Sequence, residues 1–221
     1  MRFGLFGGTF NPVHLGHLRA ASEVKEGFAL EEIFLIPAAV PPHKMPSEVV
    51  DAGDRLHMLN LALEDTIGLS VSDVELKRSG PSYTIDTVTH FKRALPEKSQ
   101  IYLVMGLDAF LEIDSWKSYE ALLVQVPIIV INRPIAGSRL SSVGWELMDD
   151  YLKSNISGDY KFSELQSCYL AGDKQPIYSF EVTALNISST RIRGLIKEGR
   201  SIGYLVPREA AEFINSRGLY L

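Results

Sequence analysis

Cysteine is almost missing from this sequence, since Cys168 is the only one in 221 residues. One thiol excludes a disulfide within the chain and a zinc site built from several cysteines. Cys168 lies in a weakly patterned stretch, so we expect it to be a bystander to any chemistry.

Long apolar runs and an excess of basic residues are also lacking. The longest purely apolar run near the middle of the chain, Ile128–Ile131, is far shorter than the roughly 20 residues of a membrane helix. The formal net charge is −5, which gives no sign of a broad basic surface for nucleic acid. The start of the chain, Met1–Gly8, is too short and too rich in glycine for a signal peptide. We therefore expect a cytoplasmic protein with no membrane partner and no nucleic-acid partner.

What the sequence does contain is an alternation of short apolar runs with amphipathic stretches, which is typical of βαβ units on a parallel sheet. The predicted strands are Arg2–Phe6, Glu32–Pro37, Leu69–Val74, Ile101–Met105, Pro127–Asn132 and Ile177–Val182. The predicted helices cover about 15–28, 54–64, 84–94, 190–197 and 208–216. We predict an α/β fold with a Rossmann-like, doubly wound, mostly parallel sheet, helices on both faces and a small C-terminal helical part. Ligands of such sheets bind at the carboxyl ends of the strands.

The pattern weakens over residues 135–176, where Trp145 and Tyr151 stand as isolated anchors among Ser, Gly and Asp. We interpret this stretch as an insertion that packs on the domain. Residues 1–221 are therefore expected to form a single domain, because a chain of this length suits one α/β unit.

The junction after the first predicted strand, GGTFNPVHLGH, carries the clearest chemical signal. Gly7 and Gly8 have no Cβ, so the backbone can come within hydrogen-bonding distance of a ligand. The helix start that follows offers unpaired N–H groups and a positive dipole end, which favour phosphate. His14 and His17 are three residues apart and share a face at that helix start, with Gly16 leaving room between them.

Two simpler interpretations of this junction stay open on the residues alone. The histidine pair could bind zinc, although His43, His57 and His90 lack a supporting ligand spacing. The glycines could also form a structural turn with incidental histidines. This interpretation does not explain why two glycines and two histidines occur together at one strand–loop–helix junction.

The junction resembles the HxGH signature of the nucleotidyltransferase superfamily and, in its Gly-Gly-Thr-Phe form, the bacterial nicotinate-nucleotide adenylyltransferases. Asn11 replaces the Asp that is common there, but a polar turn residue is kept before Pro12. Further blocks resemble this family in the family's own order, and only about 135–176 is poorly covered. They are Pro41–Lys44, Glu75–Thr87, Gly106–Trp116, Ile187–Arg193 and Tyr204–Pro207.

The resemblance implies a reaction in NAD biosynthesis. The 5′-phosphate of nicotinate mononucleotide attacks the α-phosphorus of ATP, and nicotinate adenine dinucleotide and pyrophosphate form. Such transfers need aligned phosphates and stabilised charge on the leaving group, so no protein nucleophile is expected. Mg²⁺ is the expected cofactor, held mainly through the ATP phosphates, and no protein residues are assigned as metal ligands.

The resemblance also implies three groups of site residues and a closing role of the C-terminal helices at 188–221 over the ATP site. The implied catalytic residues are His14, His17, Lys44 and Arg193. The implied ATP-binding residues are Gly7, Gly8, Thr9, Phe10, Gly106, Asp108, Ser188, Ser189 and Thr190. The implied mononucleotide-binding residues are Ser82, Tyr83, Thr84, Trp116 and Arg133. Arg191 cannot share a helix face with Arg193, so only one of the two is expected to face the ligand, and the family pattern selects Arg193.

Several of these residues have a structural alternative. Ser188 and Asp108 could be ordinary N-caps of the helices that follow them. Lys44 could be a solvated surface lysine, and Trp116 could be a core residue.

Alternatives for the function also remain. Phosphopantetheine adenylyltransferase and the cytidylyltransferases share the HxGH signature, but the Ser82–Thr84 block, Trp116 and the chain length argue against them. A nucleotide-binding sensor without activity is a further alternative, and the presence of His14, His17, Lys44 and Arg193 argues against it.

Free N–H groups at a helix start near Thr84 would favour the carboxylate of nicotinate over the carboxamide of nicotinamide. A homo-oligomeric state is left open.

Overall fold

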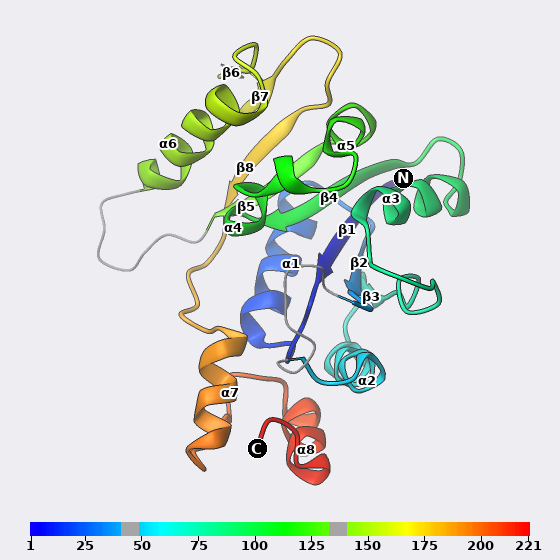
Figure 1. The fold of residues 1–221 in the computed structure, drawn as a ribbon, viewed down its shortest axis with the longest axis vertical. Helices are drawn as coiled ribbons and strands as arrows, with labels where there is room; N and C mark the ends of the chain where they lie inside the picture. Colours follow the sequence, from blue (N-terminus) through cyan, green and yellow to red (C-terminus); the bar gives the residue numbers. More distant parts are fainter. Residues whose placement is uncertain (41–48, 133–140) are drawn as a thin grey trace.

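The computed structural model describes residues 1–40, 49–132 and 141–221. In these residues one eight-stranded sheet has the order β3-β2-β1-β4-β5-β8-β7-β6. The strands from β3 to β8 in this order run parallel, and β7 and β6 are antiparallel to their neighbours (Figure 1). The strand bounds are β1 Arg2–Gly8, β2 Glu32–Pro37, β3 Leu69–Val71, β4 Gln100–Gly106, β5 Ile128–Asn132, β6 Lys161–Ser163, β7 Cys168–Leu170 and β8 Ile177–Glu181.

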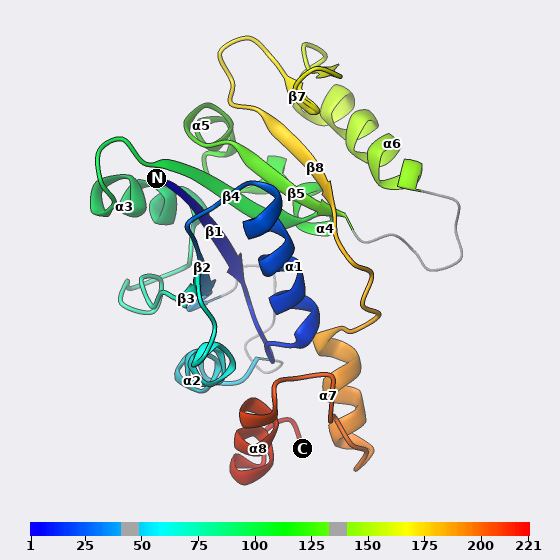
Figure 2. The same cartoon turned by 180° about the vertical axis from the view of Figure 1, so that it is seen from behind.

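Helices cover both faces of this sheet, as the sequence predicts. They are α1 Leu15–Gly27, α2 Ala52–Leu63, α3 Thr84–Ala94, α4 Leu107–Phe110, α5 Tyr119–Gln125, α6 Ser141–Tyr151, α7 Ser189–Lys197 and α8 Arg208–Arg217, with a 3-10 turn at Ile113–Ser115 and a π-helical turn at Leu152–Ile156. Figure 2 shows α1 in front of the sheet. In the described residues, no helix has both the length and the apolar character needed to cross a bilayer.

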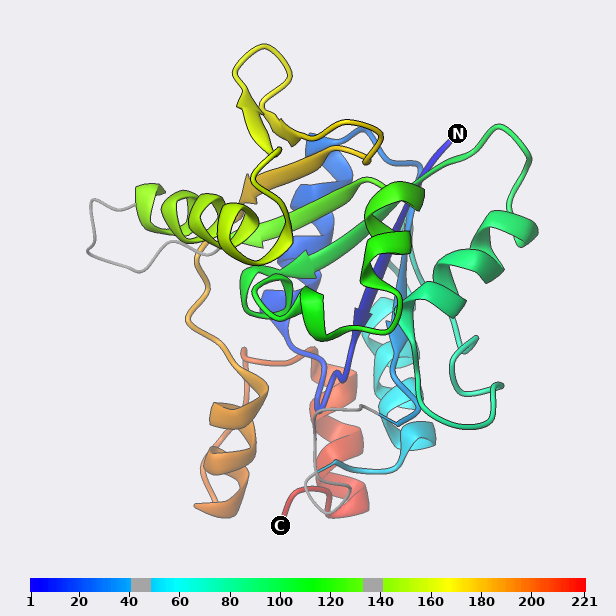
Figure 3. The ribbon, with the colours of Figure 1, turned by 45° about the horizontal axis from the view of Figure 1, so that its top comes forward.

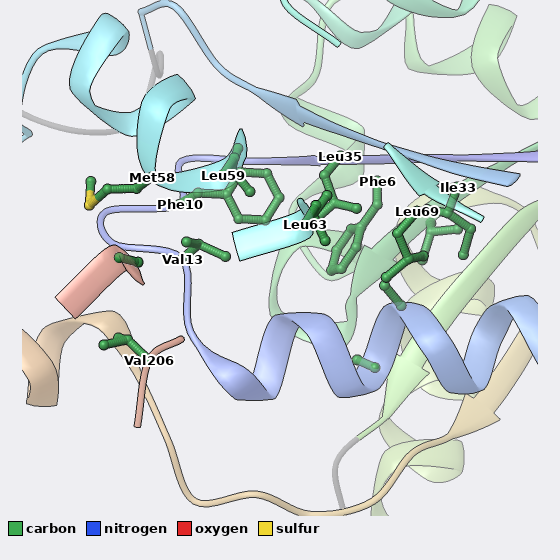
Figure 4. Close-up of a cluster of buried hydrophobic side chains, with 14 of the residues drawn as sticks. Phe6, Phe10, Val13, Ile33, Leu35, Met58, Leu59, Leu63, Leu69 and Val206 are labelled. Carbon is green, nitrogen blue, oxygen red and sulfur yellow. The ribbon is translucent and has the colours of Figure 1, made fainter. Parts of the chain in front are cut away.

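Two cores result from the alternation of side chains along each strand. Val104 and Ile129 face the core under α1, α2, α7 and α8, whereas the preceding residues, Leu103 and Ile128, face the core under α3, α4, α5 and α6. Figure 4 shows part of the first core, where side chains from β1, β2 and α2 meet. This burial on both faces explains why the strands appear in the sequence as continuous apolar runs.

The position of β1 in the sheet creates the place for a ligand. β1 pairs with β2 on one side and with β4 on the other, so the connections leave it in opposite directions. A crevice forms at such a switch point, beyond the carboxyl ends of the two central strands. The helices α7 and α8 lie at this end of β1 (Figure 1).

All predicted strands and helices are present, with shifted ends. β1 and β4 continue to Gly8 and Gly106, so the glycines belong to strand ends, whereas β3 already ends at Val71. The stretch 135–176 does more than pack on the domain, because β6 and β7 extend the sheet and α6 covers it. Trp145 packs edge-on against Phe162 at 4.7 Å, so this anchor is not isolated.

Candidate active site

A cavity of about 320 Å³ lies at the carboxyl ends of β1 and β4, where the switch point predicts it. Its wall combines segments that are far apart in the sequence. Of the predicted site residues, those in the wall are Gly7, Gly8, Thr9, Ser82, Tyr83, Thr84, Gly106 and Trp116. The structure therefore brings part of the predicted ATP group and most of the predicted mononucleotide group to one place.

The two glycines at the end of β1 have different surroundings. A Cβ on Gly7 would meet nothing within 4 Å, so its backbone is open to a ligand. A Cβ on Gly8 would lie 3.0 Å from Cζ of Phe10. Gly8 therefore also makes room for a side chain of the protein itself.

The Phe10 side chain does not contact the cavity, contrary to what its place in the predicted ATP group suggests. Phe10 is 2% exposed and packs edge-on against Phe6 and against His17, with a centroid distance of 5.0 Å to the His17 ring. Figure 4 shows Phe10 in the core beside residues of α2. Only the backbone of Phe10 is left for a nucleotide, while its ring supports His17.

The histidine pair forms one stacked unit at the start of α1. His14 is the N-cap residue, and its backbone N–H donates to Nδ1 of His17 at 3.3 Å. The two rings are stacked, with centroids 3.6 Å apart and 21° between the planes. A Cβ on Gly16 would lie 3.1 Å from Nδ1 of His14, so the glycine allows the ring to lie against the helix. The shared face predicted from the spacing is therefore present.

The two arginines at the start of α7 have different surroundings, as their spacing predicts. Arg193 is half-buried and faces the first loop, whereas Arg191 is exposed and donates to the carbonyl of Asn186. Ser188 is an N-cap, because its Oγ accepts from the N–H of Arg191 at 3.2 Å. The structural alternative for Ser188 is therefore correct, and its hydroxyl is engaged within the helix start.

Two hydrogen bonds join α7 to the first loop. Ser189 Oγ donates to the carbonyl of Pro12 at 2.9 Å, and Arg193 Nη1 donates to the carbonyl of Asn11 at 3.0 Å. Arg193 also donates from Nη2 to Oγ1 of Thr190 at 3.4 Å. The first turn of α7 is thus held next to the segment that leads to the histidines.

Asp108 is not an N-cap, so that alternative is wrong. The N-cap of α4 is Gly106, and Asp108 is an exposed residue within the first turn. A Cβ on Gly106 would lie 2.5 Å from Oδ1 of Asp108. The glycine therefore allows the carboxylate to lie against the end of β4, beside the cavity.

Two predicted site residues, Lys44 and Arg133, lie outside the described residues. The whole Pro41–Lys44 block does so as well. Their roles stay predictions.

Arg55 is a site-supporting residue that sequence analysis missed. It is 1% exposed, and it donates to the carbonyls of Thr9 at 2.8 Å, Ala38 at 2.7 Å and Val50 at 3.1 Å. One guanidinium thus holds the first loop, the segment after β2 and the approach to α2 together. Burial lowers the pKa of Arg55, and the carbonyl acceptors compensate for its desolvation. The sequence does contain a signal for this buried role, because Arg55 lies at helical spacing from Met58 on the apolar face of α2.

Glu75 and Lys117 also line the cavity and were not singled out as site residues. Glu75 is buried and accepts from Oγ1 of Thr87 at 2.7 Å, which in turn accepts from Arg78. Ser82, a predicted ligand residue, uses its Oγ to accept from the N–H of Ala39 at 2.9 Å. These contacts fix the wall around the start of α3.

Known proteins resemble this chain over its whole length. A model of the cytidylyltransferase-like family matches residues 5–195. The protein named "Probable nicotinate-nucleotide adenylyltransferase" of Desulfatibacillum aliphaticivorans is 40% identical, with 100% of each chain covered. A protein of the same name from Pseudomonas syringae pv. tomato is 40% identical over 99% of this chain and 93% of its own length.

The fold has a solved counterpart. The structure of Plasmodium falciparum nicotinic acid mononucleotide adenylyltransferase complexed with NaAD superposes with a TM-score of 0.71, covering 99% of this chain and 97% of the other, at 16% identity. Identity this low supports the fold only. Taken with the full-length relatives, these matches show that the chain belongs to the cytidylyltransferase-like family, among relatives named nicotinate-nucleotide adenylyltransferase.

Proposed function

We propose that this protein transfers AMP from ATP to the 5′-phosphate of nicotinate mononucleotide and releases pyrophosphate. The observation that carries the proposal is the shared cavity at the ends of β1 and β4, which joins the glycine strand end to Tyr83, Thr84 and Trp116. The names of the full-length relatives support the same reaction.

In the proposed reaction, an oxygen of the acceptor phosphate forms a bond to the α-phosphorus while the bond to the leaving pyrophosphate breaks. We assign His14 and His17 to the charge that develops on the phosphates, because preorganised donors stabilise such charge most effectively. The stacked pair is held in one geometry before substrate arrives, so little reorganisation is needed. We also assign the hydroxyl of Thr9, a residue of the cavity wall, to the same phosphates.

The other predicted ATP contacts surround this centre. The first turn of α7, with Thr190 and Arg193, lies against the first loop and offers N–H groups and a cation to the β- and γ-phosphates. Gly106 and Asp108, at the end of β4, offer an open backbone and a carboxylate to a ribose. Trp116 offers an aromatic face to the cationic pyridine ring.

We expect activity to depend on added Mg²⁺. Within residues 1–40, 49–132 and 141–221, no three or more His, Cys, Asp and Glu side chains gather where they could cage a metal ion. This donor set fits a cation that arrives on the nucleotide phosphates, as Mg²⁺ commonly does. Activity should disappear in excess chelator and return with Mg²⁺, and metal analysis of protein purified without added metal should find no stoichiometric zinc. Stoichiometric zinc would revive a metal site at the histidine pair.

We expect nicotinate mononucleotide to be preferred over nicotinamide mononucleotide. α3 begins at Thr84, and the carbonyl of Tyr83 accepts from Asp86 and Thr87. The N–H groups of Thr84 and Ile85, as the first in a helix, have no partner within it. A carboxylate can accept from such donors with both oxygens, whereas a carboxamide presents a donor, a mismatch of roughly 1–3 kcal/mol or about one to two powers of ten.

The test is a panel of acceptors at saturating ATP with pyrophosphate release as the signal. Nicotinate, nicotinamide and phosphopantetheine acceptors separate the proposed function from its relatives within the superfamily. Release with none of them would favour a nucleotide-binding sensor. A kcat/KM for nicotinamide mononucleotide equal to or above that for nicotinate mononucleotide would contradict the assigned acceptor.

A further inference from the structure

Lys117 is a cation in the wall of the cavity that the reaction chemistry does not use. It follows Trp116 on the segment between α4 and α5, which lies on the same face of the sheet as α3 (Figure 3). Its Nζ lies 4.3 Å from the centroid of the Tyr83 ring and 3.4 Å from Oδ2 of Asp86. Both partners belong to the start of α3, so the ammonium group is held over the first turn of that helix.

Stability alone does not account for this arrangement. The side chains of Lys117 and Asp86 are 48% and 47% exposed, and ion pairs that are this accessible to water contribute little to folding. The cation–π contact is similarly modest at such exposure. What the contacts do is place one positive and one negative group beside the N–H groups of Thr84 and Ile85.

The two candidate acceptors differ in charge at this place. Both carry a cationic pyridine ring, but nicotinate adds a carboxylate, so its base is neutral overall, whereas the nicotinamide base keeps a net positive charge. A cation beside the 3-substituent attracts the carboxylate and repels the nicotinamide base, and an anion does the opposite. The pair of charges can therefore shift acceptor choice in either direction.

We propose that Lys117 and Asp86 together set the selectivity for the acidic pyridine nucleotide, with Lys117 favouring it and Asp86 opposing it. The inference rests on the proposed function and deepens it. Lys117 has two effects in this arrangement. It attracts the carboxylate of nicotinate, and it pairs with Asp86, whose negative charge would otherwise repel that carboxylate. The two residues must then act with opposite signs, which a merely structural ion pair would not do.

The experiment compares the wild-type protein with Lys117→Gln, Asp86→Asn, the double variant and Lys153→Gln. Lys153 is the matched control, since it forms an ion pair with Asp149 at α6 and the π-helical turn, which lie away from α3 (Figure 1). The readout is the ratio of kcat/KM for nicotinate mononucleotide to that for nicotinamide mononucleotide at saturating ATP. Thermal unfolding of each variant checks that it is folded.

We expect the ratio to fall about tenfold in Lys117→Gln and to rise several-fold in Asp86→Asn, as the loss of one partly exposed charge beside the base can produce. The double variant should lie between the two, and Lys153→Gln should match the wild type. Half-exposed charges are screened by salt, so both shifts should shrink as ionic strength rises.

The outcomes separate the two claims. A wild-type protein that prefers nicotinamide mononucleotide contradicts the proposed function and this inference with it. A wild-type protein that prefers nicotinate mononucleotide, with a ratio that stays constant or moves in the same direction in both single variants, contradicts the inference alone.

Discussion

Replacing His17 with Ala is expected to lower kcat by about 10²–10³-fold, the loss typical of one preorganised donor to developing charge. His17 is the more exposed member of the stacked pair, so its ring is the more accessible of the two to a phosphate. The substitution removes the acceptor of the His14 N–H at the helix start, which costs on the order of 1 kcal/mol of stability. Such a loss leaves a typical domain folded.

Steady-state kinetics with ATP and nicotinate mononucleotide, together with circular dichroism, test this expectation. His90→Ala is the control, because His90 is an exposed histidine on α3, away from the junction between β1 and α1. Wild-type turnover in a folded His17→Ala protein would remove the central role assigned to this ring.

The second large effect is expected for Arg55→Met, which should destabilise the protein by about 3–5 kcal/mol and abolish most activity. The variant leaves the carbonyls of Thr9, Ala38 and Val50 without their shared donor in a buried place, and each orphaned group costs roughly 1–3 kcal/mol. It also frees the first loop from the segment after β2, so the backbone at Thr9 loses its anchor.

Denaturant unfolding measures the stability loss. Arg191→Met serves as the control, because Arg191 is exposed and donates to the nearby carbonyl of Asn186. Arg55→Lys separates stability from positioning. Lysine keeps the charge but lacks the planar fork, so it should stay folded at low temperature and still lose turnover. If Arg55→Met had the same free energy of unfolding as the wild-type protein, the hydrogen bonds to the three carbonyls would contribute nothing to stability.

The elements whose signals are local could be predicted from the sequence. Buried parallel strands such as β5 appear as apolar runs, and helices such as α3 appear as periodic stretches, because each pattern reflects the element's own geometry. The strand–glycine–histidine junction was recognisable for the same reason, since the spacing of His14 and His17 already determines their shared face. Several blocks in family order then indicated the reaction.

Other features could not be predicted, because they depend on partners far away in the sequence. The strands β6 and β7 have three residues each and become recognisable only when β7 pairs with β8. Short α5 was missed for a similar reason, since its buried leucines are defined by the core that they join.

The candidate site likewise contains features that local sequence predicts and features that depend on the fold. The fold class and the shared face of His14 and His17 follow from the sequence alone, whereas the choice of Arg193 over Arg191 rests on the family resemblance and stays a prediction. Three features appear only in the folded chain: the Phe10 ring packs in the core, Arg55 joins three segments, and Lys117 lies over the start of α3. The physical reason is that a helix or strand pattern depends on residues close together in the sequence. A hydrogen bond or a charge contact between distant segments forms only after the fold has brought the two segments together.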